Sequence, residues 1–200
     1  YCKSYPFAGG KQIVCENWRN LISVGAKPLA ITNCLNFGNP ENQEIMGQFA
    51  ECLEGVKEAC NFLNYPVVSG NVSFYNGTNK KNIFPTPVIG GIGLIKKLSK
   101  PISHNFKENN STLILIGKTF GHIEQSCFLK ENYSITEGMP PEINLINEKN
   151  NGESLLKLID KNLILSAHDI SNGGLITALA EMTLTSDFGA KIHKPKKLTN

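Results

Sequence analysis

The sequence has no apolar run long enough to span a bilayer and no secretory signal at its start. It also lacks a basic stripe. The net charge is only +3, and the one dense basic cluster is KPKK at residues 194–197. We interpret KPKK as a solvated tail, because a nucleic-acid interface gathers its basic residues on one face. Neither a membrane partner nor a nucleic-acid partner is therefore expected.

Metal-binding and phosphate-binding signatures are missing too. The 6 cysteines include no Cys-x-x-Cys pair, so the sequence does not predict a zinc site. Cys52 and Cys60 fall in an apolar helical pattern, where a thiol behaves as a small hydrophobic group. Unpaired thiols are typical of a reducing compartment, so we expect a cytoplasmic protein. Neither a Walker-type lysine loop nor a Gly-x-Gly-x-x-Gly motif occurs.

The chain has enough apolar material for a real core. Its 200 residues, 40% of them hydrophobic, suffice for one domain or two small ones. The first residue is Tyr1 rather than Met, so we expect a piece of a longer polypeptide.

The first half of the chain alternates helical and strand patterns. Residues 11–24 carry apolar side chains at near-helical spacing, and Gly25 is suited to end that helix. A second helix is predicted with Asn39 as its N-cap and Pro40 as its first helical residue. Strands are expected at residues 28–35, 66–70 and 85–95, which are strongly apolar.

The second half repeats this alternation after a polar passage, residues 96–111, which we interpret as a link between two domains. Repeated strand–loop–helix units predict an α/β or α+β protein. Strands are expected at residues 112–118 and 163–170, and helices at residues 122–131, 152–162 and 175–184.

Two polar segments follow apolar strands: TNCLNFGNPE at residues 32–41 and SGNVSFYN at residues 69–76. Ligands in such folds bind beyond strand ends, where loops converge. Asn36, Asn71 and Ser73 offer neutral oxygens of the kind that Mg²⁺ accepts beside phosphate and water. The alternative is a set of well-capped turns, since Asn, Ser and Gly are common turn residues.

A third polar segment, in the second half of the chain, is SAHDISNGGL at residues 166–175. Here we expect a strand to end at Asp169 and Ser171 or Asn172 to cap the following helix, whose N-terminus would attract phosphate. Asp169 and Ser171 are therefore candidate binding residues, and His168 is a possible base. The alternatives are a structural histidine and an aspartate that only caps the turn.

Four phrases together resemble the phosphoribosylformylglycinamidine synthase family, the ATP-dependent amidotransferases of purine biosynthesis. They are GAKPLAITNCLNFGNPE, PVVSGNVSFYN, PTPVIGGIGLI and AHDISNGGLITALAEM, in family order over nearly the whole chain. The resemblance implies the second of two related synthetase halves. It also implies an aminoimidazole ribonucleotide (AIR) synthetase-like N-terminal domain at residues 1–97 and a C-terminal domain at residues 98–200. We expect both domains to be incomplete.

The resemblance also implies a ligase reaction. The family converts formylglycinamide ribonucleotide, glutamine and ATP to the amidine, glutamate, ADP and phosphate. Carried over by position, Asn33 and Gly70 match ATP contacts, Asn71 matches a Mg²⁺ ligand and Ser73 matches a substrate contact. No catalytic residue is assigned within this chain, because no nucleophile–base pair is evident.

Two positions depart from the family pattern. Asn33 stands where the family typically has Asp, in TDCLNFG, and Asn172 stands where HDISDGG is usual. The change at position 33 removes a carboxylate and keeps a similar shape. We therefore expect a neutral wall of a site whose carboxylates come from elsewhere.

The expected partners follow from the family parts that the sequence does not contain. These are the first synthetase half and a glutaminase that supplies ammonia, so we expect the isolated chain to be inactive and to self-associate through its N-terminal domain. Two alternatives stay open. One is a non-catalytic, nucleotide-binding structural half. The other is a related synthetase, such as the aminoimidazole ribonucleotide, selenophosphate or thiamine-phosphate enzymes.

Overall fold

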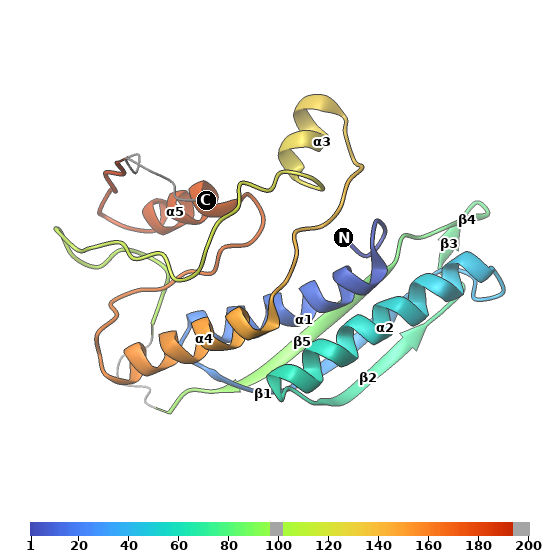
Figure 1. The fold of residues 1–200 in the computed structure, drawn as a ribbon, viewed down its shortest axis with the longest axis horizontal. Coiled ribbons are helices and arrows are strands. Elements are labelled where there is room, and N and C mark those ends of the chain that lie inside the picture. Colours follow the sequence, from blue (N-terminus) through green and yellow to red (C-terminus); the bar gives the residue numbers. More distant parts are fainter. Residues whose placement is uncertain (97–101, 194–200) are drawn as a thin grey trace.

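The N-terminal region is a small sheet covered on one face by two long helices. The computed structural model describes residues 1–96 and 102–193 (Figure 1). The N-terminal elements are α1 (Pro6–Ser23), β1 (Lys27–Asn36), α2 (Gln43–Leu63), β2 (Val67–Ser73), β3 (Gly77–Thr78), β4 (Lys81–Asn82) and β5 (Thr86–Leu94). Three helices follow: α3 (Cys127–Tyr133), α4 (Leu145–Asp160) and α5 (Gly174–Leu184). None of the described helices is long and apolar enough to cross a membrane.

The main sheet has the strand order β2-β1-β5, while β3 and β4 form a separate hairpin. Strand β1 runs parallel to β2 and antiparallel to β5. The β1–β2 register shifts once: Ile31 pairs with Val67, but Thr32 pairs with Ser69, which leaves Val68 as an extra residue in β2. Such a bulge changes which side chains of the bulged strand share a face with its neighbour.

Helices cover one face of the sheet and leave the other face exposed in the described chain. Ile31 and Leu35 of β1 are buried against the helices, at 0% and 2% exposure. Thr32 lies on the opposite face and is exposed. On that outer face β5 presents Val88 and Ile92, which are 52% and 59% exposed. The helices therefore cover one face and leave the other bare in the described chain.

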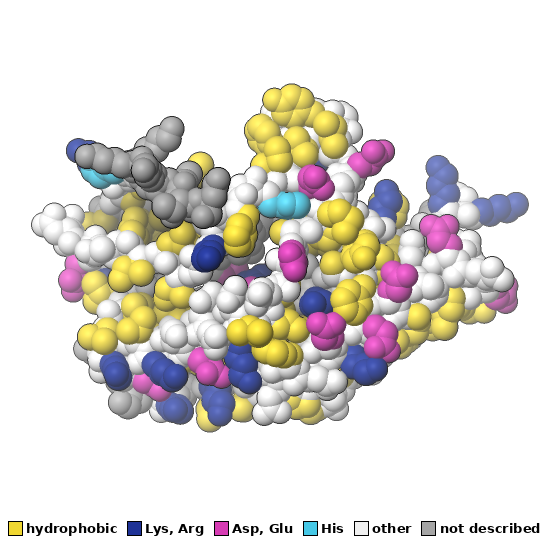
Figure 2. Space-filling model, in the orientation of Figure 1, with side chains coloured by type: hydrophobic (Ala, Val, Ile, Leu, Met, Phe, Trp, Pro, Cys, Tyr) yellow, Lys and Arg dark blue, Asp and Glu magenta, His cyan; other side chains and the backbone are white. Residues whose placement is uncertain are grey.

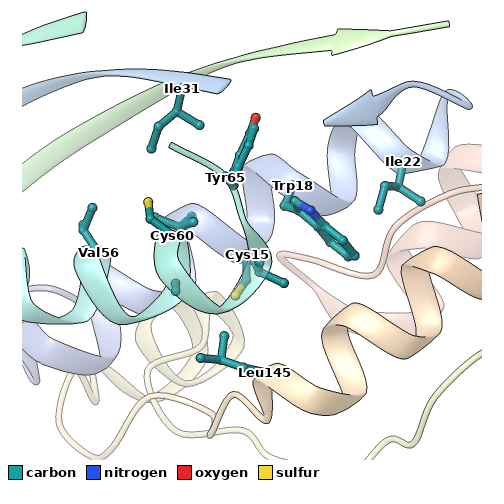
Figure 3. Packing of buried hydrophobic residues seen from close by; sticks show 11 residues of the cluster. Cys15, Trp18, Ile22, Ile31, Val56, Cys60, Tyr65 and Leu145 are labelled. Atoms are coloured by element: carbon teal, nitrogen blue, oxygen red, sulfur yellow. The ribbon is translucent and has the colours of Figure 1, made fainter. Parts of the chain in front are cut away.

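The main core lies between the sheet and the helices and continues to α4 (Figure 3). Trp18 of α1 and Tyr65, just before β2, are buried with Ile31 of the sheet. The Tyr65 hydroxyl donates a hydrogen bond to Asn17 Oδ1 (2.7 Å), so its polar end is satisfied. Leu145 of α4 joins the same cluster from the far side of the helical layer.

Helices α1 and α2 approach each other at glycines. A Cβ on Gly55 would overlap the Phe7 carbonyl oxygen and lie 2.9 Å from its carbon. A Cβ on Gly10 would overlap the Cys52 carbonyl oxygen in the same way. The two backbones are therefore in direct contact, and larger side chains would force them apart.

The helix ends confirm one prediction and correct another. Gly25 follows α1 with φ +79° and donates its amide to Ile22 O (2.8 Å), as a helix-ending glycine does. Helix α2 begins at Gln43, not at Pro40. Its N-cap is Asn42, whose Oδ1 accepts from Glu44 N at 2.9 Å, while Asn39 Oδ1 forms a separate turn with Glu41 N.

The strands expected at residues 112–118 and 163–170 do not form among the described residues. A strand needs a continuous hydrogen-bonded neighbour, and residues 163–170 make only isolated backbone bonds, such as Ala167 N to Ser103 O (3.2 Å). The predicted helices do form, although α3 is shorter than expected and α4 begins earlier, at Leu145. The sheet is thus confined to the N-terminal region of the described chain.

Helix α4 docks on α1, whereas α3 projects from the body and carries apolar side chains on its surface (Figures 1 and 2). Gly152 of α4 lies against the Trp18 ring, and the Arg19 guanidinium pairs with Glu148 at 2.9 Å. The predicted boundary between residues 97 and 98 and the KPKK segment lie outside the described residues, so the two-domain division stays a prediction.

Candidate functional site

Five of the predicted site residues, Asn33, Asn36, Gly70, Asn71 and Ser73, lie toward the carboxyl ends of β1 and β2. Parallel strands bring their carboxyl ends to one edge of the sheet. The register pairs Asn33 with Gly70, Cys34 with Asn71, and Asn36 with Ser73. We expected the strand to end at residue 70, but β2 continues to Ser73, so Asn71 and Ser73 are held by a ladder rather than by a loop.

The pairing divides these residues between two faces. Asn33 and Gly70 share the helix-covered face with Leu35, whereas Asn71 and Ser73 share the outer face with Asn36. Strand alternation places Val72, between Asn71 and Ser73, on the helix-covered face. It does pair with Leu35, but it is 47% exposed because β2 is an edge strand.

Gly70 is required by its neighbour. A Cβ at this position would overlap Asn33 Oδ1 and come within 2.6 Å of the Asn33 backbone oxygen. The Asn33 carboxamide therefore lies directly against the Gly70 backbone. Because glycine has no side chain, the neutral Asn33 amide occupies the space beside the Gly70 backbone that a Cβ would fill.

The Asn36 side chain forms hydrogen bonds within the sheet. Its Nδ2 donates to Thr86 O of β5 (3.1 Å) and to Cys34 O (3.3 Å), and the Cys34 thiol lies 3.6 Å from Asn36 Oδ1. The amide thus bridges β1 to β5. Its hydrogens are used structurally, and only its oxygen has capacity left for a ligand.

Ser73 is held by a residue that our sequence analysis passed over. Asn76 Nδ2 lies 2.9 Å from Ser73 O, 3.1 Å from Ser73 Oγ and 3.0 Å from Phe37 O. Asn76 sits three residues after Ser73 and directly before Gly77, which gave it the appearance of an ordinary turn residue. The serine-to-asparagine spacing was the signal available.

The site is electrically neutral. Its side chains are amides and hydroxyls, and no group of three or more His, Cys, Asp or Glu suited to a metal occurs in the described part of the chain. The exposed Asn71 carboxamide fits Mg²⁺ as a single hard-oxygen ligand.

The second candidate segment is organised around His168. Its Nδ1 lies 3.1 Å from Asp169 Oδ1 and its Nε2 lies 2.9 Å from Glu181 Oε2 of α5. A neutral imidazole has one N–H, so bonding both carboxylates at once needs the imidazolium form or a protonated carboxyl. Asp169 is thereby tied to His168 and does not cap the turn.

Helix α5 begins differently from our expectation. Its N-cap is Gly173, with φ +81° and no side-chain capping bond, so neither Ser171 nor Asn172 caps it. Only the Ser171 backbone oxygen contributes, accepting from Gly174 N at 3.1 Å. In Figure 1, α5 lies at the opposite end of the molecule from the carboxyl ends of β1 and β2. The structure therefore does not bring Asp169 and Ser171 into the first site.

The chain belongs to the family of AIR synthase related proteins. Residues 1–95 match the family model of the N-terminal domain, and residues 109–198 match that of the C-terminal domain. These matches confirm the AIR synthetase-like fold inferred from the four sequence phrases.

Within that family the chain is similar to phosphoribosylformylglycinamidine synthase subunit PurL. It is 58% identical over 200 residues to that protein of Pelagibacter ubique, covering 100% of this chain and 27% of the relative. It is 52% identical over 192 residues to that of Bradyrhizobium diazoefficiens, covering 96% and 26%. The chain thus spans about a quarter of the length of these relatives.

A solved structure gives the same result for the fold. T. maritima PurL complexed with FGAR aligns with a TM-score of 0.54 and 26% identity, over 86% of this chain and 24% of that chain.

Proposed function

We propose that the chain is part of an ATP-dependent ligase that converts formylglycinamide ribonucleotide to its amidine in purine biosynthesis. The observation that carries this proposal is the β1–β2 register, which gathers Asn33, Gly70, Asn71 and Ser73 at one sheet edge. The names of the 58% and 52% identical relatives support the same reaction. So does the T. maritima relative, which binds FGAR.

In the proposed reaction, ATP phosphorylates the amide oxygen of the substrate and ammonia then displaces phosphate. Phosphoryl transfer depends on positioning and on Mg²⁺ to neutralise charge, not on a protein nucleophile. We assign Asn33 and Gly70 to ATP, Asn71 to Mg²⁺ and Ser73 to the ribonucleotide. The neutral amides and hydroxyls of this edge suit that division of labour.

The proposal also requires partners. The described residues supply no carboxylate cluster for the metal, so the remaining synthetase half provides the charged ligands and a glutaminase provides ammonia. The isolated chain is inactive under this proposal. The unpaired thiols of the described chain support a cytoplasmic location.

The bare outer face of the sheet is the proposed contact with another half or with a second copy. Val88, Ile92 and Leu94 of β5 are 52%, 59% and 54% exposed there, a patch that a partner sheet would cover. Sedimentation of the chain with Ile92→Lys tests this. Association that is unchanged by the new charge would contradict it.

The metal assignment is tested in a chimaeric synthetase, in which these 200 residues replace the matching segment of the 58% identical relative. Asn71→Ala removes one neutral ligand, so the Mg²⁺ concentration for half-maximal turnover should rise about tenfold. Asn82→Ala is the matched control, because it removes one bond between the neighbouring β3–β4 hairpin and Asn39 N (2.9 Å) without touching the proposed ligands.

The competing function is a structural half that binds nucleotide without turning it over. The neutral Asn33 side chain favours this structural function, because the family typically has a carboxylate at that position. Under that function, Asn71→Ala lowers assembly or thermal stability and leaves turnover per assembled site unchanged. A nucleotide titration with and without Mg²⁺ on the same chimaera separates the two, since a ligase site should bind ATP in a Mg²⁺-dependent way.

A further inference from the structure

Asn76 makes an unusual set of contacts for a turn residue. Its Nδ2 faces three acceptors: Phe37 O beyond β1 (3.0 Å), Ser73 O at the end of β2 (2.9 Å) and Ser73 Oγ (3.1 Å). Its backbone N–H donates to Phe37 O as well (3.2 Å). One residue therefore ties the ends of the two strands that carry the candidate site.

The orientation of the amide is determined by these contacts. Two of the three neighbours are carbonyl oxygens, which only accept, so the nitrogen and not the oxygen must face them. The amide oxygen then lies 3.3 Å from Ser73 Oγ and can accept the hydroxyl proton. An aspartate in this position would place an oxygen against two carbonyls and have no hydrogen to donate.

The consequence for Ser73 is that its oxygen is held whichever way its proton points. Without a ligand, the hydroxyl can donate to Asn76 Oδ1 across the long 3.3 Å contact. With a ligand, the proton can turn to a ligand oxygen while Nδ2, 3.1 Å away, still donates to Oγ through the hydrogen that it shares between Ser73 O and Ser73 Oγ. Both residues are half-buried, so water competes poorly for these bonds.

We infer that Asn76 is a positioning residue, which holds the Ser73 hydroxyl in place to donate a hydrogen bond to the bound ribonucleotide. The inference rests on the proposed function, because it needs Ser73 to contact substrate. Asn76 itself touches no substrate, and its effect passes through Ser73. The inference therefore predicts that the effects of substituting Ser73 and Asn76 on substrate binding are coupled. A purely structural role of Asn76 would not produce this coupling.

The test is a double-mutant cycle in the chimaeric synthetase, assayed with formylglycinamide ribonucleotide, ATP and ammonia. Ser73→Ala and Asn76→Ala should each raise KM for the ribonucleotide about tenfold, the effect of one lost hydrogen bond, and leave KM for ATP unchanged. The double variant should be no worse than Ser73→Ala alone. Asn82→Ala, which removes a comparable hydrogen bond between the β3–β4 hairpin and Asn39 N, should leave KM unchanged.

The outcomes separate the inference from the proposed function. If Ser73→Ala changes KM but Asn76→Ala does not, or if the two effects multiply in the double variant, the positioning role is wrong and the proposed function stands. If Ser73→Ala has no effect, the substrate assignment fails and the inference fails with it. Where Asn76→Ala does not assemble, Asn76→Gln takes its place, since it keeps an amide but moves it by one CH₂.

Discussion

The N-terminal and C-terminal regions of this molecule place their apolar residues in opposite ways. In residues 1–96, strand β1 and helices α1 and α2 bury theirs in a shared core. In residues 102–193, the side chains of Leu113 to Ile116 are 37–72% exposed, and Phe120 is 85% exposed. Of the buried apolar residues described, only Pro140, Leu145, Ala178 and Met182 lie beyond residue 101. Similar apolar runs thus give a packed sheet in one region and uncovered segments in the other.

The difference shows what a polar site needs. At the ends of β1 and β2, ladder partners on both sides of β1 fix where each amide and hydroxyl lies. Around His168, the side-chain hydrogen bonds are to a sequence neighbour and to one helix. Positions set by a ladder are held by the whole sheet, whereas positions set by local contacts move when the local segment moves.

The largest expected effect comes from the α1–α2 contact, which the N-terminal core depends on. Gly55→Val places a side chain against the Phe7 backbone, so we expect a loss of about 3 kcal/mol in the free energy of unfolding. Gly47→Val is the matched control in the same helix, because a Cβ there meets nothing within 4 Å. Urea unfolding followed by circular dichroism measures both. Equal effects would show that the glycine contact is not what holds the core.

The buried thiols predict an alkaline loss of stability that belongs to the N-terminal region alone. Burial raises the pKa of the Cys15 thiol to about 12 and that of Cys60 to about 11. Above about pH 9 the unfolded chain loses thiol protons that the folded chain keeps, so stability falls as pH rises towards 12. The slope is about 1.4 kcal/mol per pH unit for each such thiol.

Cysteine variants locate that effect. Cys15→Ala should remove its share of the slope between pH 9 and pH 12, whereas Cys127→Ala, which changes an exposed thiol of the C-terminal region, should leave the slope intact. Urea unfolding at several pH values gives the measurement. A slope that disappears with Cys127 would contradict the assignment.

The smallest expected effect compares one N-cap from each region. Asn42 Oδ1 accepts from Glu44 N at the start of α2, and Ser126 Oγ accepts from Leu129 N at the start of α3. Asn42→Ala should lower the global free energy of unfolding by about 1 kcal/mol, because α2 is part of the core. Ser126→Ala should only fray α3. Hydrogen exchange checks this: protection of β1 amides should fall with the first variant and not with the second.

The sequence predicts most of the N-terminal fold and less of the rest, for a physical reason. The pattern of residues 28–35 predicts β1 correctly, because its apolar side chains face helices that the same local pattern also predicts. Residues 112–118 have an equally good strand pattern, yet no strand forms there. Pairing depends on a neighbour far away in the sequence, and local composition carries no record of it.

The candidate site divides in the same way. Asn33, Gly70, Asn71 and Ser73 come together as their placement after strands suggested. The two-face arrangement and the commitment of Asn36 to Thr86 were not predictable, because they follow from tertiary pairing. The bond between Asp169 and His168 was not predicted, because it depends on how the chain turns before α5, and the role of Asp169 as a binding residue stays a prediction.

The extra residue at Val68 determines which face of the sheet each later residue of β2 points to. Counting forward from Val67 with strict alternation would assign Asn71 and Ser73 to the helix side and Val72 to the bare side, the reverse of the observed arrangement. One residue of length, and no change in chemistry, decides which ligands each side of the sheet can reach. When relatives are compared, a gap at this position should therefore be treated as an exchange of the two faces, even where every functional letter is retained.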